Sequence, residues 1–251
     1  MVGIYIFQHD IIFKPTPLPL SYKFQFDQPF TEHFIPTEQE ELLNVIHFPA
    51  NNTSKGLILY FHGNADHLQR WGEYAKDLTK HDFDVLMMDY RGYGKSTGKC
   101  DESNILYDAN VVYEWAKEHI VFDKLIIYGR SLGTGVGAKF ATLHPSDLVV
   151  LETPFYSIED VFMQKMGYFK IPLALSFRNS FENHRFIPKI KCPIIIIHGT
   201  KDKVVPYDSG RKLVPLLKEK DYFYTIPGGK HKNLNEFEAF HHILTEHFSK
   251  I

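Results

Sequence analysis

One stretch decides the fold: Leu125-Ile126-Ile127-Tyr128-Gly129-Arg130-Ser131-Leu132-Gly133-Thr134-Gly135-Val136-Gly137-Ala138-Lys139-Phe140. Its first four residues form a short apolar run that predicts a buried strand, and small and apolar residues recur at helical spacing after Ser131. The serine therefore lies on a turn between a strand and a helix. Small residues are needed two positions to either side of it, because side chains there would collide with neighbouring backbone. This pattern predicts a nucleophilic serine.

The composition is that of an ordinary globular protein. The 251 residues fit one α/β domain, 23% of them are charged, and the net charge of −2 is spread along the chain rather than in blocks. We therefore expect no nucleic-acid partner. Cys100 and Cys192 show neither metal-ligand nor disulfide spacing, so we expect free thiols and no metal site at the cysteines.

The N-terminal segment predicts neither a leader nor a membrane span. Met1–Phe13 is apolar but interrupted by polar residues, lacks a basic start and a cleavage site, and is shorter than the roughly 20 apolar residues that span a bilayer. We expect a cytoplasmic protein, or a membrane-associated one if an anchor precedes residue 1. In Lys14–Pro19 three prolines at alternate positions prevent regular structure. Residues 1–20 are therefore predicted to be a surface strap.

Strands and helices alternate along the rest of the chain, which predicts right-handed crossovers and a mostly parallel sheet flanked by helices. The first strands instead alternate apolar and polar residues and are predicted to form an antiparallel edge. The strands are expected at Tyr22–Phe26, Glu32–Ile35, Leu42–Phe48, Leu57–Phe61, Val85–Asp89, Leu125–Tyr128, Leu148–Leu151, Pro193–His198 and Tyr222–Ile226, and the helices at Leu68–Lys80, Ser103–Glu118, Asp208–Lys218 and Leu234–Phe248.

Polar residues that follow the predicted strands supply partners for the serine. Sites in such sheets form at the carboxyl ends of the strands. Asp202 follows one strand, and His231 follows the last strand on a loop that contains two glycines. His231 is predicted to act as general base for Ser131, and Asp202 is predicted to hold the imidazole in the right tautomer. Glu152 is the alternative acid, whereas His198 is expected to brace the loop.

The developing oxyanion needs two hydrogen-bond donors. We assign these to the backbone N–H of Leu132, at the start of the helix, and to that of Asn64, where Gly63 lets the chain approach the nucleophile. The side chain of His62 is expected to be structural. The glycine-rich segment Tyr90–Gly94 favours a scaffold turn over a substrate clamp.

Four of these segments together resemble a known family. From about Tyr22 onward the chain resembles the α/β-hydrolases, in particular the serine hydrolases related to the eukaryotic α/β-hydrolase-domain depalmitoylases and to bacterial S33-like peptidases. The resemblance implies cleavage of acyl esters or thioesters without a cofactor. Many relatives carry an N-terminal anchor, and we do not expect residues 1–13 to supply one. The matching segments are His62-Gly63-Asn64-Ala65, Asp89-Tyr90-Arg91-Gly92-Tyr93-Gly94-Lys95-Ser96, Gly129-Arg130-Ser131-Leu132-Gly133 and Glu152-Thr153-Pro154-Phe155.

Residues 154–191 are too many for a simple connection between two strands. They are rich in aromatic residues and methionine, which favours a small helical lid over an acyl pocket, with an ordinary packed helical insertion as the alternative. The residues expected to line the pocket are Phe155, Met163, Met166, Phe169 and Leu173.

These features predict a serine hydrolase that cleaves carboxylic esters or thioesters with apolar, short-to-medium acyl groups on small or lipid-like substrates. A serine peptidase is the second interpretation, and it would need carboxylates for a substrate amino terminus; Glu152, Glu159 and Asp160 are the candidates. A catalytically silent binding module on the same fold is the third. The sequence does not indicate an oligomeric state.

Overall fold

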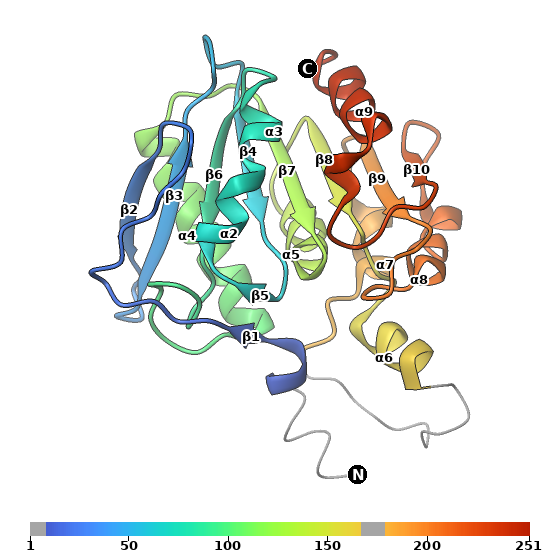
Figure 1. The fold of residues 1–251 in the computed structure, drawn as a ribbon, viewed down its shortest axis with the longest axis horizontal. Coiled ribbons are helices and arrows are strands. Elements are labelled where there is room, and N and C mark those ends of the chain that lie inside the picture. The colour runs from blue at the N-terminus through green and yellow to red at the C-terminus, as the bar shows by residue number, and fades with distance from the viewer. Residues whose placement is uncertain (1–8, 167–178) are drawn as a thin grey trace.

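The computed structural model describes residues 9–166 and 179–251, which form a central eight-stranded sheet with helices on both faces (Figure 1). The strand order is β10-β9-β8-β7-β4-β6-β3-β2, and the pairs from β10 to β6 are parallel, whereas β3 pairs antiparallel with both β6 and β2. The mostly parallel sheet with an antiparallel N-terminal edge is thus confirmed. The strands are β2 (Thr31–Pro36), β3 (Leu42–Phe48), β4 (Leu57–Phe61), β6 (Asp84–Met88), β7 (Leu125–Arg130), β8 (Leu148–Glu152), β9 (Ile194–Gly199) and β10 (Tyr222–Ile226).

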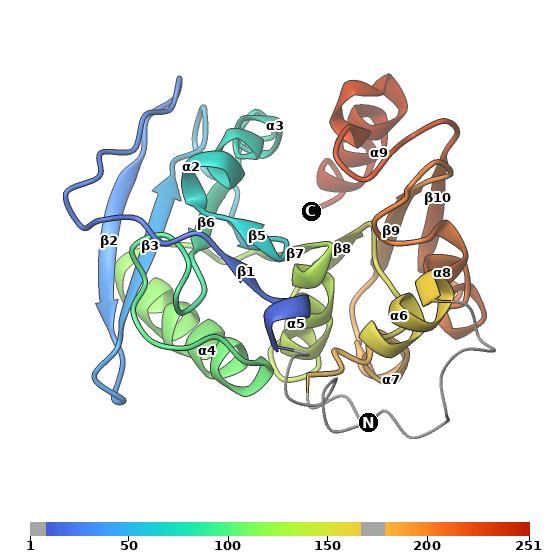
Figure 2. The same cartoon turned by 60° about the horizontal axis from the view of Figure 1, so that its bottom comes forward.

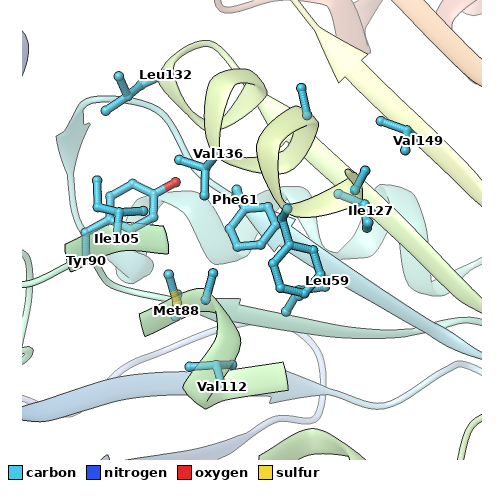
Figure 3. Close-up of a cluster of buried hydrophobic side chains, with 14 of the residues drawn as sticks. Leu59, Phe61, Met88, Tyr90, Ile105, Val112, Ile127, Leu132, Val136 and Val149 are labelled. Atoms are coloured by element: carbon cyan, nitrogen blue, oxygen red, sulfur yellow. The ribbon is translucent and has the colours of Figure 1, made fainter. Parts of the chain in front are cut away.

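Alternate residues of the central strands face two separate hydrophobic clusters. In β4, Leu57, Leu59 and Phe61 pack with α4 (Glu102–His119) and α5 (Leu132–Ala141), and Figure 3 shows part of this cluster. The intervening Ile58 and Tyr60 pack on the opposite face, with the cluster that includes α2 (Leu68–Trp71), α3 (Lys76–Thr79) and α9 (Glu238–Phe248). Because both faces are covered, the strand is an unbroken apolar run.

The first predicted strand was wrong. Tyr22–Phe26 forms no strand, because the side chain of Gln69 bonds its backbone: the Gln25 N–H donates to Gln69 Oε1 at 2.9 Å, and Gln69 Nε2 donates to the Gln25 carbonyl at 2.7 Å. The aromatic side chains of this segment pack inward instead, and the Phe26 and Phe48 rings lie 5.0 Å apart.

Three of the predicted helices are interrupted, whereas the helices that became α4 and α5 are continuous. The first breaks at a 3-10 turn, Gly72–Tyr74, where Gly72 touches the ring of Phe26. The third ends early as α8 (Tyr207–Arg211), followed by the 3-10 turn Val214–Leu216, since Pro215 supplies no backbone donor. In the last, the 3-10 turn Leu234–Glu236 precedes α9.

The N-terminal strap is tied to the loop that follows β4. Contrary to expectation it contains a short strand, β1 (Lys14–Pro15), which pairs in parallel with β5 (Ala65–Asp66). The bonds come from residues that directly precede a proline: the Lys14 N–H donates to the Asn64 carbonyl at 3.0 Å, and the Leu18 N–H to the Gly94 carbonyl at 2.7 Å. The strap therefore supports the segment that precedes β5.

The insertion 154–191 is described in two parts, with Phe169 and Leu173 outside the described residues. The first part carries α6 (Ile158–Met166), and the second carries α7 (Asn183–Phe186) and the 3-10 turn Ile187–Lys189. Asn183 anchors the second part, because its Nδ2 donates to the Phe155 carbonyl at 2.9 Å. Among the described helices, none is both long and apolar enough to cross a membrane. Both cysteines are free.

Candidate active site

The turn at Ser131 has the strained geometry that its glycines predict. Ser131 lies between β7 and α5 with a φ of 53°, a value that ordinary side chains rarely adopt. A Cβ on Gly129 would lie 2.4 Å from the Gly133 carbonyl oxygen, and a Cβ on Gly133 would lie 2.0 Å from that of Phe61. Both positions therefore exclude any larger residue, as the sequence predicts.

The structure brings the three predicted catalytic side chains together. His231 Nε2 lies 3.0 Å from Ser131 Oγ, and His231 Nδ1 lies 2.8 Å from Asp202 Oδ2. Asp202 follows β9 and His231 follows β10, and these two loops touch, since the Lys201 N–H donates to the Gly229 carbonyl at 2.8 Å. The ends of β7, β9 and β10 lie at the same edge of the sheet. They therefore bring Ser131, His231 and Asp202 into a hydrogen-bonded chain, although these residues are far apart in the sequence.

Asp202 is held as a carboxylate. Burial opposes its charge, but hydrogen bonds from His198 and His231 outweigh burial, so the pKa of Asp202 lies well below its usual value. Its Oδ1 also accepts the N–H groups of Val204 at 2.8 Å and Val205 at 2.9 Å. An ionised Asp202 accepts a hydrogen bond from His231 Nδ1–H, which leaves the Nε2 lone pair directed at Ser131.

His198 braces the Asp202 loop, as expected. Its Nε2 donates to the Val205 carbonyl at 3.1 Å and lies 3.4 Å from Asp202 Oδ2. The imidazole is fully buried, so it fixes the loop from within the protein.

Glu152, the alternative acid, is engaged by other partners. Its Oε1 lies 3.1 Å from Arg130 Nε, and its Oε2 accepts the Tyr128 hydroxyl at 2.7 Å. The buried guanidinium of Arg130 lies 4.0 Å from the Tyr74 ring centre, and its Nη2 donates to the His231 carbonyl at 3.2 Å. Glu152 therefore anchors an arginine that in turn holds the backbone of His231.

Two backbone donors stand beside Ser131 with no protein acceptor among the described residues: the N–H groups of Leu132 and Asn64. Leu132 is the first residue of α5, where backbone N–H groups have no partner within the helix. At Gly63 a Cβ would lie 3.4 Å from that of Ser131, so the Asn64 loop approaches the nucleophile closely.

The side chain of His62 orients the second donor. Its Nδ1 donates to the Gly63 carbonyl at 2.7 Å. Because C=O and N–H point in opposite directions across a trans peptide, this bond turns the Asn64 N–H away from the His62 ring. Burial lowers the pKa of His62 to about 4, so the ring is neutral, and its Nε2 lies 3.5 Å from the buried carboxyl of Asp89. The structural role expected for His62 agrees with these contacts.

The Tyr90–Gly94 segment acts as a scaffold. The Tyr90 hydroxyl donates to the His62 carbonyl and the Tyr93 hydroxyl to the Asn64 carbonyl, both at 2.8 Å. Arg91 is bound by Asp108 through contacts of 2.7 to 3.1 Å. All three side chains are thus used within the protein, and two of them hold the loop that carries Asn64.

An apolar cavity of about 150 Å³ opens beside Ser131, Leu132 and Asn64. Of the predicted pocket residues, Phe155 lines it, whereas Met163 does not; the neighbouring Phe162 does. Met166 ends α6, and its side chain lies outside the described part of the structure. The other lining residues come from separate parts of the chain and are Ile11, Ile12, Ile158, Val161, Lys165, Val204 and Val205. Figure 2 shows α6, α5 and the N-terminal segment gathered at this edge of the sheet.

The family model described as serine aminopeptidase, S33, matches residues 52–179, about half of the chain. The chain belongs to this family. Among curated proteins, it is 30% identical over 228 residues to lysophosphatidylserine lipase ABHD12 of Macaca fascicularis, a match that covers 79% of this chain and 57% of the relative. It is 31% identical to protein ABHD12B of Homo sapiens over 202 residues, 71% of this chain and 56% of the relative. The matched region thus spans little more than half the length of these relatives.

Solved structures show the fold of this S33-family chain. The esterase Pf2001 of Pyrococcus furiosus aligns with a TM-score of 0.73 at 20% identity over 95% of this chain and 97% of the esterase. The monoacylglycerol lipase of Paleococcus ferrophilus aligns with a TM-score of 0.63 at 21% identity over 83% of this chain and 98% of the lipase. The resemblance to the α/β-hydrolases is therefore confirmed.

Sequence reasoning missed several residues of the S33-family site. Arg130 occupies the variable position of Gly-x-Ser-x-Gly, and no pattern marks it. Val204 and Val205 follow Asp202 after a single residue, which is a usable signal. Ile11 and Ile12 belong to an apolar run that the strap prediction set aside. Within the described residues, no group of three or more His, Cys, Asp and Glu side chains could hold a metal ion.

Proposed function

We propose that this chain is a serine hydrolase that cleaves carboxylic esters or thioesters with apolar, short-to-medium acyl groups, through Ser131, His231 and Asp202. The observation that carries the proposal is the pair of contacts of His231, 3.0 Å from Ser131 Oγ and 2.8 Å from Asp202 Oδ2, beside an apolar cavity.

The proposed reaction has two halves. As Ser131 Oγ bonds to the acyl carbon, His231 Nε2 takes its proton, and the carbonyl oxygen becomes an oxyanion that accepts from the Leu132 and Asn64 N–H groups. His231 then gives the proton to the leaving oxygen or sulfur, and the acyl-enzyme remains. In the second half water attacks the acyl carbon, gives its proton to His231, and the proton returns to Ser131 Oγ as the acid departs.

The cavity supports an apolar acyl group of limited size. An engineered apolar cavity of about 150 Å³ accepts benzene, which suggests an acyl group of roughly six carbons. In this proposal α6 serves as a lid, because it supplies Phe162 and Val161 to the cavity wall. The names of the relatives, lysophosphatidylserine lipase, esterase and monoacylglycerol lipase, also support ester substrates.

The second candidate, an aminopeptidase, is suggested by the family description. It would need a carboxylate in the cavity for the substrate amino terminus. Glu152 is paired with Arg130, Asp160 pairs with Lys212, and Lys165 is the one charged side chain among the described residues that line the cavity. A cation at this place favours the esterase over the peptidase.

The first prediction tests the nucleophile. We expect Ser131→Ala to abolish labelling by a fluorophosphonate probe and to remove ester hydrolysis, because alanine lacks the attacking oxygen. The fold should persist, because the smaller side chain fits the same turn. Labelling gels and circular dichroism of both proteins provide the test. Covalent labelling of the variant at the wild-type rate would show that another residue is the nucleophile.

A parallel assay separates the two candidate functions. p-Nitrophenyl hexanoate reports esterase activity, and alanine p-nitroanilide reports aminopeptidase activity. We expect turnover of the ester and none of the anilide by the same preparation. Turnover of the anilide alone would replace the proposed function with a peptidase.

A further inference from the structure

A second hollow lies on the other side of the proposed catalytic histidine. It has a volume of about 730 Å³ and is lined by His231 and Asp202 together with four lysines. All four lysines are exposed, and they come from the loops that follow β9 and β10. We call it the lysine hollow and define it by Lys201, Lys203, Lys230 and Lys232. Val204 lines both the lysine hollow and the apolar cavity, so the two spaces adjoin.

The lysine hollow carries an uncompensated positive charge. None of its four ammonium groups forms an ion pair with the described residues, whereas other lysines such as Lys95 and Lys218 do. The single carboxylate that lines the hollow is Asp202, which is buried and already bonded to His231 and two backbone N–H groups. Four cations in one concave surface raise the local concentration of anions and attract them from solution.

The reaction chemistry says what occupies each space. His231 returns its proton to the leaving group, so the leaving oxygen or sulfur must lie on the His231 side of the acyl carbon. The acyl group then lies on the other side, in the apolar cavity beside Leu132 and Phe155. The lysine hollow is thus the space into which the leaving group extends.

We propose that the lysine hollow binds the phosphate group of a phosphate-bearing leaving group, and that this hydrolase prefers acyl esters or thioesters whose alcohol or thiol carries phosphate. This inference rests on the proposed function. Lysine binds phosphate as a compact point charge, and several lysines together match its multiple charge. Two kinds of substrate share this chemistry, acyl glycerophosphates and acyl thioesters of coenzyme A.

The test compares substrates that differ only in phosphate. One pair is 1-hexanoylglycerol and 1-hexanoylglycerol 3-phosphate, and the other is the hexanoyl thioester of N-acetylcysteamine and hexanoyl-coenzyme A. Six carbons keep all four substrates soluble, so no membrane is present. We expect wild-type kcat/KM to favour the phosphate-bearing member of at least one pair, and added salt to reduce this preference by screening. The pair that shows the larger preference identifies the source.

A quadruple variant removes the charges of the hollow. Replacing Lys201, Lys203, Lys230 and Lys232 by glutamine should lower the preference for phosphate about tenfold or more, since each exposed charge contributes modestly. The matched control removes four charges elsewhere, K76Q, K99Q, K189Q and K191Q, all exposed lysines that line neither the cavity nor the hollow. This control should keep the wild-type preference.

Several results would overturn the inference. One is a wild-type preference near unity for both pairs; another is an equal loss of preference in the control variant. Lysines that affect only binding to anionic vesicles, with the preference for soluble substrates unchanged, would belong to a membrane-docking surface instead. If the quadruple variant fails to fold, competitive inhibition of the wild type by glycerol 3-phosphate, but not by glycerol, decides the question. Loss of fluorophosphonate labelling and of all neutral-ester turnover would refute the proposed function itself.

Discussion

The backbone conformation of Ser131 is strained and costs about 1–3 kcal/mol. It persists because hydrogen bonds from the surrounding structure hold it. Its N–H donates to the Glu152 carbonyl at 2.9 Å. Its carbonyl accepts both the Thr134 N–H at 2.9 Å and the Thr134 hydroxyl at 2.7 Å. The backbone of the serine is therefore fixed by hydrogen bonds to β8 and to the first turn of α5.

The second prediction concerns the acid. We expect Asp202→Asn to lower kcat by about 10⁴, the magnitude known for this change in another serine hydrolase, because the amide favours the wrong tautomer of His231. Steady-state kinetics on p-nitrophenyl hexanoate measure it. Glu152→Gln is the comparison, and it should reduce kcat far less, since Glu152 reaches the histidine only through Arg130. If Glu152→Gln proves more damaging, the acid is misassigned.

The third prediction concerns Arg130, a positioning residue. Lysine at this position cannot bond Glu152, cover Tyr74 and reach the His231 carbonyl at the same time, because it lacks the planar fork of donors. We expect Arg130→Lys to lower kcat about 10- to 100-fold with little change in KM, since a displaced base costs chemistry more than binding.

A control separates this positioning role from general stability. Arg91→Lys disrupts another buried arginine pair, with Asp108, that contacts no proposed catalytic side chain. Both variants should lower Tm, but Arg130→Lys should lower kcat by a much larger factor. Equal effects of the two changes on kcat would assign Arg130 a purely structural role.

Among the elements, α5 shows how packing and chemistry restrict the same helix. Gly133 approaches the Phe61 carbonyl, Gly135 lies against Phe181, and Gly137 has more space, since a Cβ there would lie 3.2 Å from the nearest atom, a methyl group of Ile127. The first turn of α5 thus contacts the end of β4 directly. This contact brings the Leu132 N–H and the loop that carries Asn64 to the same place.

The fourth prediction uses this gradient along α5. Gly133→Ala should destabilise the protein by about 2 kcal/mol or more and reduce activity, because its methyl group would overlap the backbone of β4. Gly137→Ala, one turn further along, is the control; its contact is with a side chain that can shift, and alanine favours helix by up to about 1 kcal/mol. Urea unfolding of both variants measures the difference. A tolerated Gly133→Ala would mean that β4 and α5 separate easily.

Among the secondary-structure elements, the sequence predicts the bounds of strands better than those of helices, for a physical reason. The strands β4, β7, β8 and β9 are covered on both faces, so each is a continuous apolar run with recognisable bounds. Helix ends depend instead on single contacts, such as Gly72 against Phe26 or Pro215 after α8, that no periodicity reveals. The three proposed catalytic residues were found because each follows a strand in a known order.

Over the whole molecule, the cavity is what the sequence could not predict. Its wall combines a helical turn at residues 9–12, Phe162 of α6, and Val204 beside Asp202, three segments far apart in the chain. In the sequence, Ile11, Phe162 and Val204 are ordinary apolar residues, and nothing near them indicates that they line a common cavity. They meet because the strap is tied to the Asn64 loop and the insertion returns to Phe155, contacts that only tertiary structure defines. The expectation that Met163 lines the wall failed for this reason.

The last prediction tests this composite wall. Each methylene buried in the cavity adds up to about 0.8 kcal/mol of binding, so kcat/KM should rise from acetyl towards hexanoyl esters. It should then fall, because a cavity of about 150 Å³ leaves further methylenes in water. Phe162→Ala should enlarge the cavity and move the optimum to longer chains. Met163→Ala, on the same helix but outside the wall, should leave the optimum in place. A series of p-nitrophenyl esters from two to twelve carbons measures the profile, and an optimum that Phe162→Ala does not move would show that the acyl group binds elsewhere.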